Sequence, residues 1–310
     1  MNNIGAIVYG GLGNQLFVIF TILSYYFDNK CIDYKFYTKE DPTRIYFWDT
    51  VFSNISSKVY PEKNVEGTYE FLYYPIKEIP IYTWDIVLDG FFTNPKFFER
   101  NMDKIKSLLG LEEKINNVLI KYPEYSINKT IVIKHIKNDR YIQNSIGDEN
   151  NIKEYNPPQK PTYYIEAFKT LIRKGVDIYD YDILYFCEEN DNASVIDHNK
   201  EINDALKELT GKDLRYKKVS DNIPEWEQLF IMTSAKHYII PNCSLCWFGA
   251  YLSSSNNPIV CCSNTWLGYK YYGRITDDIF PDSWIKIGEG YNADDLRLSN
   301  SQYIDNIVNV

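Results

Sequence analysis

Apolar and polar residues follow one another along this chain in a pattern that predicts short strands, each followed by a helix. Residues 4–9 form a short apolar run, a glycine-rich turn comes next, and residues 16–27 form a longer apolar run. A short apolar run that ends at glycine is typical of a buried strand, whereas the longer run has the length of a helix. The N-terminus therefore predicts a strand, a tight turn and a helix.

Similar alternation continues along the chain. In the first part we expect strands at 34–37, 69–73 and 86–92 and helices at 95–109 and 114–122. In the second part we expect strands at 131–136, 183–186, 238–240 and 259–262 and helices at 161–174, 224–234 and 244–252. Strands that alternate with helices of this length indicate parallel βαβ units. We therefore expect an α/β fold with ligands at the carboxyl ends of its strands, in the loops after residues 9, 136, 186 and 240.

The composition sets limits on the kind of protein. A chain of 310 residues with 45% hydrophobic residues can form one large α/β unit or two domains of ordinary size. The net charge of -9 argues against a nucleic-acid-binding protein, because phosphate neutralisation needs clustered Lys and Arg. A small phosphorylated ligand needs only a local positive patch and stays compatible with this charge.

The uncharged stretch from residue 4 to residue 27 resembles a membrane span in composition only. Three glycines and the pair Asn14–Gln15 divide it into pieces too short to cross ~30 Å of hydrocarbon. The sequence also has no basic segment and no small-residue cleavage site of a signal peptide. We therefore expect a cytoplasmic protein without a transmembrane segment, which fits a bacterial or viral origin.

The six cysteines do not form a metal-binding pattern. Cys243 and Cys246 have Cys-x-x-Cys spacing, but a zinc site would need a second such pair, and Cys261 and Cys262 are adjacent. Reduced thiols in a cytosolic protein are the simplest interpretation. We expect no metal site and no cofactor.

The glycine-rich turn reads Gly10-Gly11-Leu12-Gly13-Asn14-Gln15-Leu16-Phe17. A glycine turn at a helix start leaves backbone N–H groups that suit an anionic ligand. Asn14 is placed either to cap this helix or to point its amide into a cleft. The spacing alone does not specify a phosphate site, because position 16 is Leu where a third glycine would stand. A tight turn that only packs a helix against a sheet therefore stays open.

The glycine run resembles the N-terminal signature of the α1,2-fucosyltransferases, glycosyltransferase family 11. Residues 88–98, 131–137 and 240–252 resemble three further segments of that family, in the same order. The resemblance implies a GT-B fold, in which two Rossmann-like domains enclose a cleft. It implies an N-terminal acceptor-side domain over residues 1–128, a donor-binding domain over 129–270, and a C-terminal tail over 271–310 that packs across both.

The middle segment departs from the family's His-x-Arg-Arg-Gly-Asp-Tyr motif. His135 matches its first position and Tyr141 its last, whereas Lys137 and Asn138 replace the two arginines. Asp139 and Arg140 occupy the Gly-Asp positions. A lysine is a point charge and does not reproduce the two-pronged contact of a guanidinium with phosphate.

The resemblance implies inverting, metal-independent transfer of fucose from GDP-fucose to a galactose 2-hydroxyl of a glycan acceptor. In that scheme the catalytic residues are Asp139 as the base, His135 and Asn14. The donor would be bound by Lys137, Arg140, Glu188, Glu189, Asn242, Ser244, Trp247, Gly11, Gly13 and Gln15. For Trp247, helix packing is the stronger interpretation.

Three alternatives remain. The chain could use another nucleotide sugar, or it could be a non-catalytic nucleotide- or carbohydrate-binding relative, as the changes at 137–140 would allow. Asp180-Tyr181-Asp182 also matches the Asp-x-Asp motif of metal-dependent glycosyltransferases. We expect that motif at the amino end of a strand, away from the ligand-binding edge.

Overall fold

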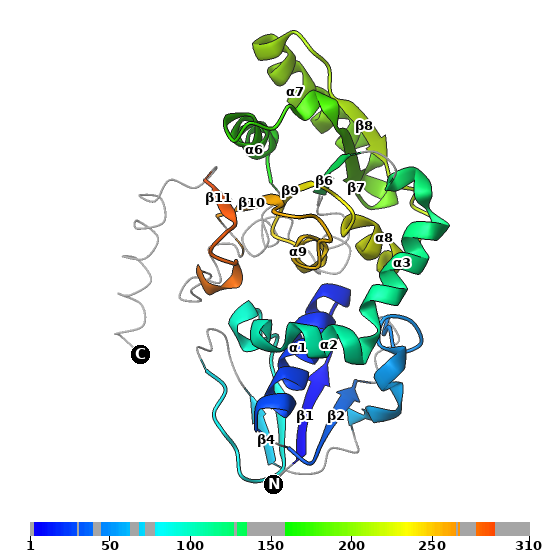
Figure 1. The fold of residues 1–310 in the computed structure, drawn as a ribbon, viewed down its shortest axis with the longest axis vertical. Coiled ribbons are helices and arrows are strands. Elements are labelled where there is room, and N and C mark those ends of the chain that lie inside the picture. Colours follow the sequence, from blue (N-terminus) through cyan, green and yellow to red (C-terminus); the bar gives the residue numbers. More distant parts are fainter. Residues whose placement is uncertain are drawn as a thin grey trace, which may run out of the picture.

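The chain folds into two α/β units, each built on a parallel sheet (Figure 1). The computed structural model describes residues 3–29, 31–39, 45–62, 68–71, 78–126, 129–134, 159–264, 266 and 277–288. The predicted α/β fold is confirmed, with two units that are each built on a parallel sheet.

The first sheet has the strand order β3-β2-β1-β5-β4, and all its pairings are parallel. Its strands are β1 (Asn3–Val8), β2 (Asp33–Thr38), β3 (Val59–Pro61), β4 (Thr68–Phe71) and β5 (Ile86–Asp89). The helices of this part are α1 (Leu12–Asn29), α2 (Met102–Leu109) and α3 (Leu111–Lys121). Short 3-10 turns lie at η1 (Ser53–Lys58), η3 (Pro95–Phe97), η4 (Glu99–Asn101) and η5 (Pro123–Tyr125).

The second sheet has the strand order β11-β10-β9-β6-β7-β8 and is also parallel throughout. Its strands are β6 (Thr130–Lys134), β7 (Asp182–Phe186), β8 (Arg215–Lys218), β9 (His237–Ile240), β10 (Ile259–Ser263) and β11 (Ile285–Ile287). Its helices are α6 (Pro161–Arg173), α7 (Asn192–Thr210), α8 (Glu225–Met232) and α9 (Ser244–Tyr251). The 3-10 turns here are η6 (Ile178–Asp180), η7 (Glu189–Asp191) and η9 (Asp277–Ile279).

The central strands of the second sheet are buried on both faces. Ile131 and Ile133 of β6 pack into one hydrophobic cluster, whereas Val132 between them packs into another on the opposite face. Successive side chains of a strand point to opposite faces, so a continuous apolar run fits a sheet covered on both sides. This explains why these strands are uniformly apolar in the sequence.

One hydrophobic core joins the two units. Phe17 and Phe20 of α1 meet Phe248 of α9, with ring centroids 4.6 and 5.3 Å apart. Phe17 also lies 4.8 Å from the ring of Trp247, and Phe98 packs against the same group. Aromatic pairs at such distances add to the stability already gained by burying their area. The contact between α1 and α9 is therefore an interior contact (Figure 1).

A buried carboxylate forms a second junction between the units. Glu227 of α8 accepts hydrogen bonds from Lys121 Nζ at 2.7 Å and from the Tyr122 hydroxyl at 2.7 Å, at the end of α3. Buried charges are retained where they are paired and hydrogen-bonded in this way. The two contacts together hold α3 against α8.

The structure differs from the sequence-based prediction in several elements. The helix expected over 95–109 is wrong in its first half, because the chain forms η3 and η4 before α2 begins at Met102. Phe98 and Asn101 have non-helical backbone angles at the two breaks. Helix α7 and strands β3, β8 and β11 were not predicted, since these segments are short or largely polar.

The domain boundaries at residues 128 and 270 remain a prediction. Strand β11, which belongs to the predicted tail, pairs with β10 at the edge of the second sheet. Asp278 in η9 forms an ion pair with Lys96 of the first unit at 3.2 Å. The described part of the tail thus contacts both units.

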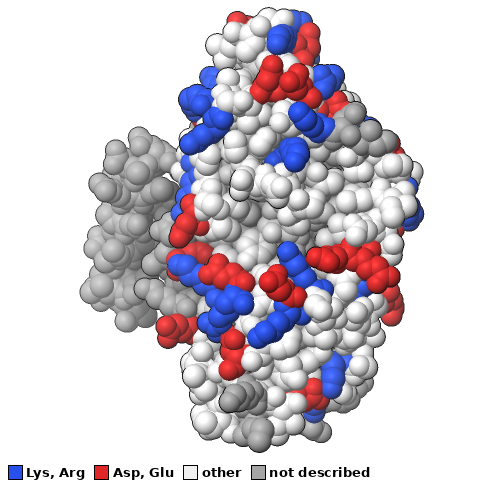
Figure 2. All heavy atoms as spheres, in the orientation of Figure 1, with Lys and Arg blue, Asp and Glu red and all other residues white. Residues whose placement is uncertain are grey.

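The surface carries mixed charges. Figure 2 shows acidic and basic side chains interspersed on one face, without a continuous basic stripe among the described residues there. Within the described ranges, every helix is too short or too polar to cross a bilayer.

Candidate functional site

The order of the strands locates the ligand-binding edge of the second sheet. From β6 the chain continues outward through β7 and β8, then returns to β9 on the other side of β6 and continues outward again through β10 and β11. The direction therefore reverses between β6 and β9. In open parallel sheets, ligands bind at the carboxyl ends of the strands at this reversal. The residues there are Lys134, which ends β6, and the segment from Pro241 to Ser244, which leads from β9 into α9.

The first sheet has its own reversal between β1 and β5. The glycine turn follows β1, and residues 90–92 follow β5. The rings of Tyr9 and Phe91 meet here with centroids 4.7 Å apart. Phe92 has a φ of 48°, a left-handed conformation that is unusual for a bulky residue and is often found near functional sites.

The two reversal points meet at Gly13. A Cβ atom added to Gly13 would lie 2.4 Å from the carbonyl carbon of Ser244 and 2.5 Å from the backbone nitrogen of Leu245. Only a glycine allows this approach between the first turns of α1 and α9 (Figure 1). Each helix start carries free N–H groups and a positive dipole end, which favour an anion. The structure thus brings together two of the four segments that carry the family resemblance.

Gln15 fixes the shape of the glycine turn. Its side chain is buried, and its Nε2 donates to the carbonyl oxygens of Gly10 at 2.9 Å and Ile45 at 2.8 Å. Gly10 itself has a φ of 82°, which favours glycine. The amide nitrogen of Gln15 is therefore used within the protein.

Asn14 does not cap α1, because the helix begins at Leu12 and Asn14 lies in its first turn. Its side chain folds against Gly10, where an added Cβ would lie 2.8 Å from Asn14 Nδ2. The half-buried amide stays close to the junction of the two units. Its predicted catalytic role remains a prediction.

Lys134 is a positive group at this site that the sequence pattern does not single out. Burial lowers the pKa of its ammonium. The nearby negative groups outweigh burial and raise this pKa above its ordinary value. These groups are the sulfurs of Cys243 and Cys246 and the carboxylates of Glu225 and Glu188. The ammonium forms no hydrogen bond or ion pair with another described residue. A charged lysine at the carboxyl end of a buried strand, without a bonded acceptor among the described residues, suits an anionic ligand. The signal in the sequence was a single charge at the end of the run Ile131-Val132-Ile133.

The predicted residues on the second unit have different surroundings. Asn242 donates from Nδ2 to the Trp266 carbonyl at 3.2 Å, and Ser244 faces Gly13 across the junction. Glu188 and Glu189 are exposed and follow β7, so they lie at the carboxyl edge of the same sheet. Glu188 is one of the groups whose charge acts on Lys134.

Trp247 is a packing residue in this structure. Its ring is fully buried, and its indole N–H donates to the Ile279 carbonyl at 2.9 Å. The ring stacks on Tyr251 with centroids 4.5 Å apart. The helix-packing interpretation fits these contacts, and direct contact of this ring with a donor does not.

The predicted residues His135, Lys137, Asp139 and Arg140 lie outside the described residues. They follow Lys134 directly in the sequence, and Lys134 ends β6 at the reversal of the second sheet. The predicted base and pyrophosphate-binding residues thus continue the chain from the site described above.

The Asp-x-Asp sequence lies at the opposite edge of the second sheet, as predicted. Asp182 begins β7, and Asp180 ends η6 just before it. The Asp182 carboxylate accepts from Arg215 Nε at 3.0 Å. This position at the amino end of the strand argues against a role in binding a donor at the carboxyl edge.

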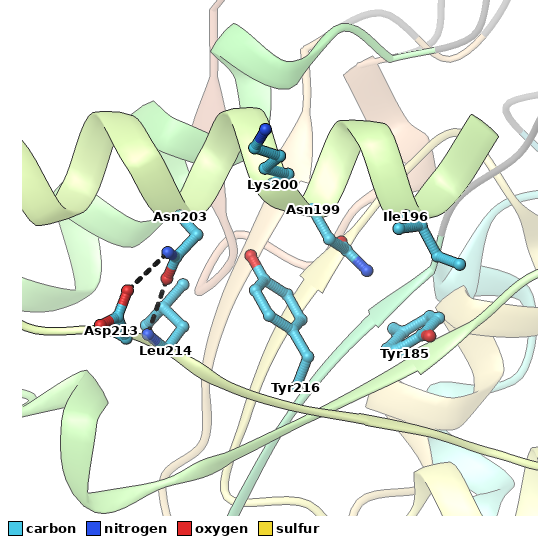
Figure 3. Close-up of a pocket in the computed structure, with 8 residues that line it drawn as sticks. All are labelled: Tyr185, Ile196, Asn199, Lys200, Asn203, Asp213, Leu214 and Tyr216. Carbon is cyan, nitrogen blue, oxygen red and sulfur yellow. Dashed lines mark hydrogen bonds between the residues drawn. The ribbon is translucent and has the colours of Figure 1, made fainter. Parts of the chain in front are cut away.

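A separate pocket of about 330 Å³ lies between α7 and the strands β7 and β8 (Figure 3). Asn203 bridges one end of it, donating to Asp213 at 2.8 Å and accepting from the backbone N–H of Leu214 at 2.8 Å. Tyr185 and Tyr216 line the sheet side, with Ile196 and Lys200 on α7. None of the predicted site residues lines this pocket.

Comparisons with known proteins give structural likenesses only. No family model and no curated protein matches the chain. A mutant FUT1 from Arabidopsis thaliana in complex with GDP is 12% identical, with a TM-score of 0.47, over 83% of this chain and 69% of that chain. POFUT1 in complex with GDP is 11% identical, with a TM-score of 0.43, over 85% and 98%. The ADP-heptose LPS heptosyltransferase II of E. coli is 11% identical, with a TM-score of 0.46, over 98% and 99%. These scores are low, and the fold class rests on the two parallel sheets of the chain itself.

Proposed function

We propose that this chain is an inverting, metal-independent glycosyltransferase that moves fucose from GDP-fucose to a hydroxyl of a glycan acceptor, the galactose 2-hydroxyl. The observation that carries the proposal is the contact of Gly13 with Ser244 and Leu245. It joins the first and last segments of the family resemblance at the ligand-binding edges of both sheets. A site shared by two such edges can hold a donor on one side and an acceptor on the other.

The chemistry of the donor explains the charges at this site. As the glycosidic bond breaks, negative charge develops on the leaving diphosphate, and fixed positive groups stabilise it. Lys134 and the first turn of α9 supply such groups in the described structure. Lys137 and Arg140 would add two more, in place of the family's arginines.

The nucleotide base and the reacting hydroxyl need further groups. A carboxylate of Glu188 or Glu189 can accept from the N1–H and N2–H of guanine together, which would select GDP. Asp139 would remove the proton of the acceptor hydroxyl as a general base, and His135 and Asn14 would be the other catalytic residues. No metal ion takes part in this scheme.

A second candidate is a non-catalytic nucleotide- or carbohydrate-binding protein. The specific observation in its favour is the loss of both motif arginines at Lys137 and Asn138. Turnover separates the two candidates.

Calorimetric titration tests the proposal directly. GDP, GDP-fucose, GDP-mannose and UDP-sugars would be titrated with and without EDTA, and turnover followed with a galactose-terminated acceptor. Binding of GDP-fucose that EDTA does not change, followed by transfer, supports the proposal. Preference for another nucleotide sugar changes the reaction, and binding without transfer favours the second candidate.

Replacing Lys137 or Arg140 by Ala is expected to weaken GDP binding by about 2 kcal/mol, because each would remove a charge-assisted contact with phosphate. Calorimetry of each variant gives the loss. Lys129→Ala, at the amino end of β6 and exposed, serves as the matched control. Wild-type affinity in both site variants would contradict the assignment.

Asp139→Asn is expected to abolish transfer while leaving GDP-fucose affinity nearly unchanged, since the amide cannot take up the acceptor's proton. Initial rates and donor titrations of the same preparation separate the two effects. The exposed Asp204→Asn on α7 is the control. Normal turnover in Asp139→Asn would show that Asp139 is not the general base.

A further inference from the structure

Two cysteines begin helix α9 at the junction of the two units. Cys243 is the N-cap residue of α9, and Cys246 lies three positions later, one turn into the helix. Cys243 is partly exposed, whereas Cys246 is buried. Helix geometry places Cα atoms three residues apart at about 5 Å, within the roughly 4.4–6.8 Å that a disulfide spans.

Both cysteines belong to the start of α9, and Cys243 makes no side-chain hydrogen bond that caps the helix. The neighbouring Cys246 thiol lowers the pKa of Cys243 to about 6; burial opposes this effect, and the Lys134 ammonium adds to it. The thiolate is the reactive form of cysteine. A helix N-terminus and a nearby lysine both favour it.

The other thiols differ from Cys243. Burial raises the pKa of Cys187 to about 11 and of Cys261 and Cys262 to about 12, and it raises that of Cys31 as well. All four of these side chains are buried. Cys243 is therefore the thiol expected to react first, with Cys246 as its neighbour.

The charged groups around the pair come from several elements. Lys134 approaches from the end of β6, and the carboxylates of Glu225, at the start of α8, and Glu188, after β7, act on that lysine. The ammonium stabilises a thiolate at Cys243, while the two carboxylates offset part of its field.

We propose that Cys243 and Cys246 form a reversible dithiol–disulfide site, in which Cys243 reacts with a low-molecular-weight disulfide and Cys246 completes the bond. This inference does not depend on the proposed sugar transfer. Where that function holds, the oxidation state of the pair alters the first turn of α9 and the charge beside Lys134, and with them the donor site.

The reaction has two exchange steps. The Cys243 thiolate attacks one sulfur of the small disulfide, forming a mixed disulfide and releasing one small thiolate. Cys246 then gives up its proton and attacks the Cys243 sulfur, forming the intramolecular bond and releasing the second small thiol. Two protein thiols are oxidised and one small disulfide is reduced to two thiols.

Two measurements on the full-length, reduced protein test the proposal. In the first, wild-type protein is alkylated with iodoacetamide between pH 5 and pH 9, and each cysteine is followed by peptide mass spectrometry. We expect Cys243 to reach half of its maximal rate near pH 6, where half of it is thiolate, whereas an ordinary thiol does so at about pH 8.5.

In the second measurement, glutathione disulfide is added and the products are mapped after alkylation of the remaining thiols. Wild-type protein is expected to form the Cys243–Cys246 bond, which dithiothreitol reverses. Cys246→Ser is expected to stop at the mixed disulfide on Cys243, and Cys243→Ser to leave Cys246 unmodified. Cys31→Ser is the matched control and should behave as wild type.

Each alternative outcome overturns the proposal. An alkylation midpoint above pH 8 would show that Cys243 is not a reactive thiolate at neutral pH. A mixed disulfide that persists in the wild type would show that Cys246 does not complete the bond. Disulfides formed by other cysteines would show that those thiols react in place of this pair. The pH profile uses the wild-type chain, so the result does not depend on whether a variant folds.

Discussion

Gly13→Ala is expected to lower the free energy of unfolding by about 3 kcal/mol, because the new methyl group has no room between α1 and α9. It would lie 2.4 Å from the Ser244 carbonyl carbon and 2.5 Å from the Leu245 nitrogen. Both are backbone atoms, so the clash cannot be relieved by rotation of a side chain. Urea unfolding, followed by tryptophan fluorescence, measures the loss.

Gly11→Ala is the matched control in the same turn. An added Cβ at Gly11 has no heavy atom within 4 Å, and the residue does not have a left-handed φ. Its stability is expected to stay within about 0.5 kcal/mol of wild type. If Gly13→Ala were as stable as Gly11→Ala, the two helix starts would not be in the contact described here.

Lys134→Met is expected to weaken GDP binding by about 2 kcal/mol, or about 30-fold, because it removes a charge-assisted contact with the diphosphate while keeping an apolar stem of similar length. Burial lowers the pKa of this lysine, but the surrounding negative groups raise it overall, so the ammonium is fully charged at neutral pH. Calorimetric titration with GDP at fixed ionic strength gives the change.

Lys236→Met provides the comparison for this variant. Lys236 is exposed and precedes β9 at the amino end of the same sheet, opposite to the proposed site. Its removal changes the net charge equally and should leave the affinity for GDP at the wild-type value. Equal affinities of both variants would show that Lys134 does not contact the diphosphate.

The local pattern of the sequence was sufficient for much of the fold. Strands β1, β6 and β9 are apolar runs that end at glycine, lysine and proline, and their boundaries could be predicted to within two residues. Helix α7 could not, because its polar residues, many of them exposed, give only a weak periodic signal. The break in the helix expected over 95–109 depends on backbone angles at Phe98 and Asn101 that no spacing rule reports.

The segments of the candidate site could be named from the sequence, but the contacts between them could not. The glycine turn and the start of α9 could be singled out by resemblance, but their meeting at Gly13 is a tertiary contact between positions far apart in the sequence. The proposed role of Lys134 was hidden because its charge stood inside a strand predicted over residues 131–136, of which the structure describes residues 131–134. Cys243 is partly exposed, whereas the other thiols are buried, and the sequence does not specify this difference in burial.

The aromatic contact between α1 and α9 has a consequence for how the chain folds during its synthesis. The strands of the first sheet are complete once residue 89 has been synthesised, yet Phe248, which covers Phe17 and Phe20, comes much later. At about 5–20 residues per second, the nascent chain exposes this aromatic face for roughly 10 to 30 s. During that interval the core of the first unit lacks the side chains of α9, and its packing is completed only when the second unit has been made.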